Sequence, residues 1–94
     1  MDMMITNVNV FRVDGEKLMA YATVIFDHAF IIRDLRIIRG KNGPFVQMPN
    51  KRTKEGTYID IAHPLSQKMR DQLELKVIQK YFEMVSTPES INIS

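Results

Sequence analysis

The chain has no cysteine among its 94 residues, and long apolar runs are also missing. Without cysteine it forms no disulfide, thiol nucleophile or cysteine-ligated metal site, which fits a reducing compartment. No apolar run approaches the roughly 20 residues of a membrane-spanning helix. Residues 1–4 show neither the positive segment nor the apolar segment of a signal peptide. We therefore expect a cytoplasmic protein for which the membrane is not a partner.

Groups suited to catalysis are also scarce. One histidine, His28, directly follows Asp27, and the two side chains could act as an acid–base couple. The other, His63, lies three residues after Asp60, but nothing supplies either couple with a nucleophile or an oxyanion pocket. Two histidines without cysteine make a poor zinc site, and residues 40–43 lack the lysine and hydroxyl residue of a phosphate loop. We expect no catalytic residue, no metal or other cofactor, and no small-molecule substrate.

The composition is that of an ordinary folded protein, with 45% hydrophobic and 26% charged residues. A chain of this length forms one small domain with a modest core. We assign the domain to residues 1–86. For the polar residues 87–94 we predict a flexible C-terminal tail.

Five segments have the composition or the alternation of β-strands. They span residues 3–13, 17–26, 30–39, 45–48 and 58–62, with turn-forming residues between them. The alternation is clearest in the second segment, where one face is predicted to be buried. That face carries Leu18, Ala20, Ala22, Val24 and Phe26. Short strands separated by regular turns are typical of an antiparallel meander.

The hydrophobic period changes after Pro64, where apolar residues recur four positions apart. They are Met69, Leu73, Val77, Tyr81 and Val85. This spacing predicts an amphipathic helix over about residues 65–85, with Ser66 as a candidate N-cap. The predicted class is therefore α+β: a small antiparallel sheet, a meander of about five strands, with a C-terminal amphipathic helix. The free edges of such a sheet favour pairing with a second copy, so we expect a homodimer.

Positive charge is concentrated in the middle of the chain, although the net charge is only +2. Residues 33–54 have a local charge of +6, because one acid, Asp34, accompanies seven cations. The cations are Arg33, Arg36, Arg39, Lys41, Lys51, Arg52 and Lys54. A basic segment favours an anionic partner, with nucleic acid as the first candidate. The alternative is that strand cations lie on solvent faces and prevent edge pairing, and the charges alone leave both interpretations open.

The strongest binding candidates are Lys51, Arg52 and Lys54, on a predicted loop between the last two strands. Three cations on one loop present donors that phosphate oxygens accept. The loop contains Pro49 and Gly56, which restrict and bend the backbone and would pre-organise the cations. The alternative interpretation is a solvated turn.

Gln67, Lys68 and Arg70 begin the predicted helix and could reach bases or phosphates if its N-terminus faces nucleic acid. A plain solvent-exposed face is the alternative for these three. Two aromatic residues flank the basic loop. For Phe45 we favour packing on the sheet, whereas Tyr58 could pack or stack on a nucleobase.

Several of these segments together resemble the SpoVG family of bacterial septation proteins. The matching segments are residues 22–27 (ATVIFD), 34–38 (DLRII), 43–53 (GPFVQMPNKRT) and 56–64 (GTYIDIAHP). The resemblance implies a small antiparallel sheet with a C-terminal helix, and it implies a dimer. It also implies a regulator of gene expression that binds DNA and, in some members of the family, RNA. It places Lys51 and Arg52 at the family's basic pair and Arg36 at its strand arginine. The start of the helix corresponds to a variable part that would tune sequence preference.

The leading hypothesis is thus a dimeric nucleic-acid-binding regulator without catalytic activity, related to the control of septation and sporulation. Its phosphate contacts would come from the basic loop and the strand arginines. The alternative is a protein-interaction adaptor in cell division or septum formation, which docks a partner through an exposed strand edge or helix and does not bind nucleic acid.

Overall fold

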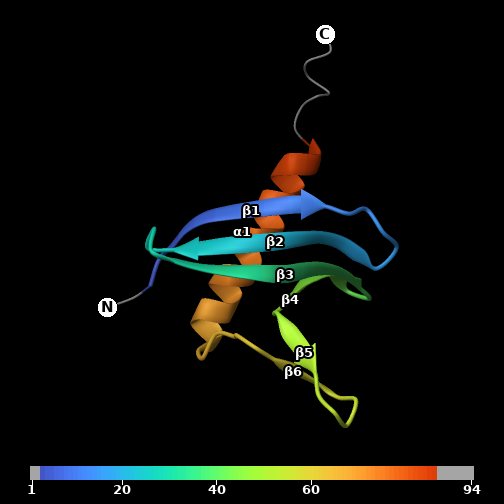
Figure 1. The fold of residues 1–94 in the computed structure, drawn as a ribbon. Helices are drawn as coiled ribbons and strands as arrows, with labels where there is room; N and C mark the ends of the chain where they lie inside the picture. Colours follow the sequence, from blue (N-terminus) through green and yellow to red (C-terminus); the bar gives the residue numbers. More distant parts are fainter. Residues whose placement is uncertain (1–2, 87–94) are drawn as a thin grey trace.

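Four strands form one antiparallel sheet in chain order, β1-β2-β3-β4 (Figure 1). The structure is a computed structural model that describes residues 3–86, so the tail predicted at 87–94 lies outside the described residues. The strands are β1 (Ile5–Arg12), β2 (Leu18–Phe26), β3 (Phe30–Gly40) and β4 (Gly43–Gln47). A short turn joins β2 to β3, and in it Asp27 and His28 adopt left-handed φ angles of 51° and 54°, respectively. Those values are typical of a type I′ hairpin turn.

The buried face of β2 follows the predicted alternation. Ala20, Ala22, Val24 and Phe26 are all buried, as the sequence pattern predicts. Leu18 is only half-buried, because the pairing of β2 with β3 shifts between Leu18 and Ala20. This irregularity buries Met19 beside Ala20, a change of face that alternation alone does not predict.

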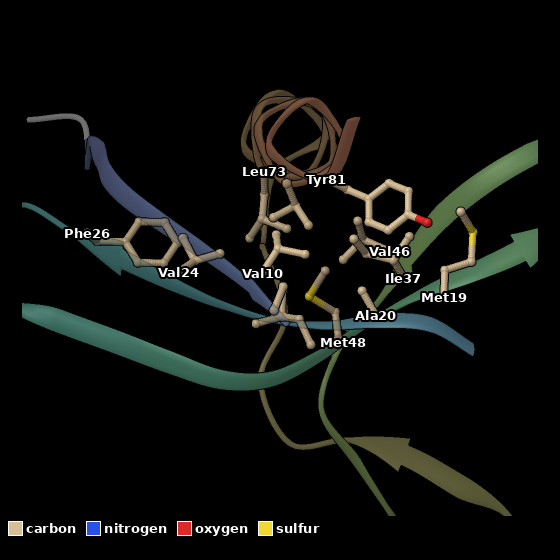
Figure 2. Close-up of a cluster of buried hydrophobic side chains, with 13 residues drawn as sticks. Val10, Met19, Ala20, Val24, Phe26, Ile37, Val46, Met48, Leu73 and Tyr81 are labelled. Atoms are coloured by element: carbon tan, nitrogen blue, oxygen red, sulfur yellow. The ribbon is translucent and has the colours of Figure 1, made fainter. Parts of the chain in front are cut away.

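One helix, α1 (Gln67–Ser86), covers that face of the sheet. The Ser66 hydroxyl accepts a hydrogen bond from the Met69 amide at 3.1 Å, which confirms the predicted N-cap. Leu73, Val77 and Tyr81 are the buried residues of the helix and form its apolar stripe (Figure 2). Within the described residues, no helix is long and apolar enough to cross a membrane.

The core lies between this stripe and the inner face of the sheet. Leu35, Ile37 and Val77 are each 0% exposed, and Val46 closes the cluster from β4. No polar or charged side chain is buried among residues 3–86, so apolar burial is the main source of stability there. This arrangement confirms the α+β class.

The edge strand β4 is tied directly to the helix. The Glu74 carboxylate accepts a hydrogen bond from the Val46 amide, 3.1 Å from Oε2, in a partly buried position. Because β4 pairs only with β3 within residues 3–86, an outward-facing amide on this strand would otherwise lack a strand partner. Glu74 therefore satisfies one edge amide and helps to keep the β4 edge from pairing elsewhere.

Replacing Glu74 with alanine should lower the free energy of unfolding by about 1–3 kcal/mol, because the partly buried Val46 amide loses its acceptor. Glu74→Gln is the control, since its side-chain carbonyl oxygen keeps an acceptor in place. Urea unfolding of both variants measures the difference. Equal stability of the alanine and glutamine variants would show that the hydrogen bond contributes nothing measurable.

The chain after β4 departs from the predicted meander. Instead of a fifth strand in the same sheet, β5 (Asn50–Arg52) and β6 (Tyr58–Asp60) form a separate two-stranded sheet. The strand leaves the main sheet at Met48 and Pro49. Proline has no amide to donate to a ladder, while the Pro49 carbonyl accepts from the Ile61 amide at 2.7 Å and closes the base of the hairpin. The described chain thus has six strands in two sheets.

Candidate nucleic-acid interface

The hairpin of residues 50–60, here called the basic arm, projects away from the main sheet (Figure 1). Its turn is held by two threonines, whose hydroxyl oxygens are 2.8 Å apart. The Thr53 amide donates to the Thr57 carbonyl at 2.7 Å, and the Gly56 amide donates to the Thr53 carbonyl at 3.0 Å. Gly56 has a φ of 90°, which L side chains rarely adopt, so glycine at this position lets the turn close.

Two of the predicted binding residues, Lys51 and Arg52, lie on β5 and not on a loop as expected. They pair across the arm with Ile59 and Tyr58, respectively. Because neighbouring strand residues point to opposite faces, the two cations project from the two sides of the arm. Arg52 Nη2 lies 3.6 Å from the position that a Cβ at Gly56 would take, so this guanidinium is beside the turn.

The third cation, Lys54, does lie on the turn of the arm. All three side chains, Lys51, Arg52 and Lys54, are exposed. None of them forms a hydrogen bond or ion pair with another residue in the described range. Their charge is therefore available to an anion without first breaking an internal contact.

The three arginines of β3 differ from one another. Arg36 is half-buried and lies over the Tyr21 ring, with its guanidinium carbon 5.8 Å from the ring centroid, a cation–π contact. Arg39 donates from Nε to the Glu16 carbonyl at 3.1 Å. Arg33 is exposed beside Asp34, where the register of β3 against β2 shifts. Only Arg36 has its cation fixed over another side chain.

Arg36 is the strand cation that the fold relates most closely to the basic arm. It pairs with Gln47, the last residue of β4. Lys51 follows four residues later, so its Cα lies within about 14 Å of that of Gln47 even in a fully extended chain. Lys41 is in the turn at the other end of β4 and is separated from the arm by the length of that strand.

The candidates at the start of α1 do not share a face with Arg36. The helix covers the inner face of the sheet, whereas Arg36 and Tyr21 lie on the outer face, turned away from α1. Gln67 donates to Asp71 at 2.8 Å, and Lys68 is exposed while Arg70 is half-buried. Figure 1 shows the first turn of α1 at the same end of the molecule as the arm.

The sequence interpretation missed an exposed aromatic surface on the outer face. Phe45, which we expected to pack, is 42% exposed there, and Phe11 is 60% exposed. Tyr58, left open between packing and stacking, is 67% exposed on the arm. The alternation along the strands could have indicated this surface. In β1 and β2, Phe11 and Tyr21 occupy the positions that alternate with buried residues and therefore point to the outer face.

Both candidate acid–base couples take part in local structure. The Asp27 carboxylate accepts the Met4 amide at 3.0 Å, and the His28 amide donates to the Thr6 hydroxyl at 3.0 Å. His63 Nδ1 lies 3.0 Å from the Pro64 carbonyl oxygen. These contacts hold the β2–β3 turn and the segment that leads to α1.

These features define a small α+β protein with a projecting basic arm and an uncovered sheet face. The model of the SpoVG family matches residues 3–83, and the chain belongs to that family. Among relatives that carry the name septation protein SpoVG, the protein of Myxococcus xanthus is 51% identical over 79 residues, 84% of this chain and 80% of its own. The protein of Borrelia hermsii is 42% identical over 95 residues, with 97% of each chain covered. That of Caldicellulosiruptor saccharolyticus is 41% identical over 88 residues, or 93% of this chain and 100% of its own.

Proposed function

We propose that the protein is a cytoplasmic, homodimeric regulator of gene expression that binds DNA, and RNA as well, in the control of septation or sporulation. The observation that carries the proposal is the basic arm, where Lys51, Arg52 and Lys54 are exposed and their side chains have no partner among residues 3–86. The names of the relatives support the link to septation. The proposed activity is binding alone, with no chemical step, cofactor or small-molecule substrate.

In this proposal the arm supplies most of the affinity through phosphate contacts. An arm with cations on both sides can enter a groove or lie along a backbone and contact phosphates on either side. Arg36 adds a guanidinium that can bind a phosphate in a bidentate manner. Arg33, Arg39 and Lys41 extend the positive field along β3, and Gln67, Lys68 and Arg70 at the start of α1 would adjust sequence preference.

Binding of this kind must weaken steeply as salt rises, because each neutralised phosphate releases counterions. Three to four phosphate contacts correspond to a slope of log K against log salt of roughly −3 to −4 for duplex DNA. Fluorescence anisotropy of labelled duplex DNA and single-stranded RNA across a salt series measures the slope. Absence of binding to either polymer at low salt would refute the proposal.

A protein-interaction adaptor is the second candidate function, because the arm also exposes apolar side chains. Tyr58 is 67% exposed and Ile59 is 48% exposed, although phosphate binding needs no apolar side chain. Measurements across the salt series distinguish the two functions. If the protein retains a protein partner equally well at low and high salt and retains no nucleic acid, the adaptor function is favoured.

The homodimer is proposed to form through β1, the edge strand opposite β4. β1 spans Ile5–Arg12 and, among the strands that the structure describes, pairs on one side only, with β2. The other edge is less available, because Glu74 already accepts the Val46 amide there. Light scattering after size exclusion should give a mass about twice the 10.9 kDa of the chain. A monomer mass at every concentration tested would contradict the dimer.

A further inference from the structure

One row of side chains crosses all four strands on the outer face. The register pairs Phe11 with Tyr21, Tyr21 with Arg36, and Arg36 with Gln47. Each strand contributes one member, and neighbouring strands are about 4.8 Å apart. The row faces away from α1, because the residues next to it in the chain are buried on the helix side. Those buried neighbours are Val10, Ala22, Leu35, Ile37 and Val46.

The two aromatic members of the row are exposed, Arg36 and Gln47 are half-buried, and all four side chains are of the kinds that bind nucleobases. Phe11 is 60% exposed and Tyr21 is 39% exposed. Arg36 lies over the Tyr21 ring, which orients its guanidinium within the row. Gln47 follows Arg36 on β4 with an amide that can donate and accept. Two aromatic rings, a guanidinium and an amide therefore lie side by side across the sheet.

We infer that the outer-face row is a binding site for the bases of single-stranded nucleic acid. Bases would stack on Phe11 and Tyr21, while Arg36 and Gln47 hydrogen-bond to phosphates or to base edges. The inference rests on the proposed nucleic-acid binding and narrows the ligand to an unpaired strand. In a duplex the faces of the bases are covered by their neighbours, so only an unpaired strand offers them to the row.

The charge on the sheet favours this occupant over a second copy seated face to face. Strands β1, β2 and β4 contain no acidic residue, and the single acid of β3 is Asp34, whereas the Arg36 guanidinium lies on the outer face itself. Two such faces in contact would bury guanidinium groups near one another with little carboxylate to pair with them, which is costly. A nucleic acid brings phosphates to the same cations. The proposed dimer uses the β1 edge and leaves the outer face free.

The test compares oligonucleotides that have the same phosphates but differ in their bases. Anisotropy is measured with a single-stranded 12-mer, with the same 12-mer carrying abasic residues at its centre, and with a duplex. The proteins are the wild type, the double variant Phe11→Leu/Tyr21→Leu, and Tyr21→Phe, which keeps a ring. Phe30→Leu is the matched control, because Phe30 is also 60% exposed but pairs with Phe26 at the end of the sheet, on the helix side. Circular dichroism establishes that each variant is folded.

The wild type should bind the intact single strand at least about fivefold more tightly than the abasic one, the lower end of the effect of one stacked base. The double variant should lose this preference but still bind the abasic strand and the duplex. Tyr21→Phe and Phe30→Leu should behave as the wild type does.

Three results would overturn the inference. If the wild type binds intact and abasic strands equally well, the protein contacts phosphates and the outer-face row does not stack bases. If the double variant becomes monomeric but binds the intact strand with unchanged affinity, the outer face is the dimer interface and does not bind bases. No binding of any oligonucleotide at low salt would remove the proposed function and this inference with it.

Discussion

Replacing Lys51 and Arg52 together with alanine is expected to weaken binding to DNA and RNA by roughly 50- to 100-fold at 0.1 M salt. Both cations are exposed on the arm and have no side-chain partner in the described part of the chain, so their loss removes phosphate contacts directly. Release of one counterion contributes about tenfold per contact at this salt concentration. The slope of log K against log salt should also become shallower by about 2.

The matched control removes the same charge from another part of the surface. Lys76→Ala/Lys80→Ala lowers the net charge equally, but both residues lie in the middle of α1, away from the arm. This control should lose less than about threefold, because charges farther from the phosphates than a Debye length are largely screened. Equal losses in the two double variants would mean that binding follows net charge alone and that the arm is not the site. A loss confined to the control would move the site to the helix.

The arm double variant is also expected to keep its fold. Neither Lys51 nor Arg52 belongs to the core, and the turn is held by Thr53 and Thr57 through their own hydrogen bonds. An unfolding temperature within about 4 °C of the wild type would be consistent with this, since exposed substitutions change stability by about 0.5 kcal/mol or less. A large fall in unfolding temperature would instead attribute the lost affinity to a disordered arm.

Local patterns in the sequence predicted much of the fold. The alternation in β2 identified Ala20, Ala22 and Val24 as buried because side chains on a strand point to opposite faces in turn. The repeat of four identified the buried stripe of α1 for the same kind of reason, since it depends only on the geometry of one helix.

Features that depend on pairing between distant segments were not predicted. The outer-face row exists because the shift in register near Arg33 brings Tyr21 opposite Arg36. No local sequence pattern predicts that shift. The separate arm was missed for a similar reason, because the apolar run in residues 58–62 resembles a core strand until its partner is known to be β5.

For the candidate site too, local sequence patterns predicted some features, whereas others depend on how the elements pack. The composition of residues 49–56 pointed to Lys51, Arg52 and Lys54, and the structure brings these three together on one arm. The sequence interpretation assigned both the helix start and the strand arginines to nucleic-acid binding without placing them relative to each other. The structure separates the two, because α1 packs on the inner face while Arg36 lies on the outer face.

The largest effect on stability is expected at Leu73, where α1 packs against the sheet. Leu73 is 2% exposed and belongs to the core cluster with Leu35 and Val77 (Figure 2). Leu73→Ala removes buried methyl groups and leaves a cavity that a small core can fill only in part, so it should cost about 2–5 kcal/mol. For a domain of this size that corresponds to a fall in Tm of roughly 10–30 °C.

The same helix offers a matched control, because Leu75 is 63% exposed. Leu75→Ala changes the same side chain at an exposed position and should stay within about 0.5 kcal/mol of the wild type. Urea unfolding and thermal melts of both variants, at one protein concentration because a dimer couples stability to concentration, measure the difference. If Leu73→Ala is no more destabilising than Leu75→Ala, the helix does not stabilise the sheet by packing. Binding by a folded Leu73→Ala protein at low temperature should match the wild type, because Leu73 lies on the inner face and Lys51 and Arg36 do not.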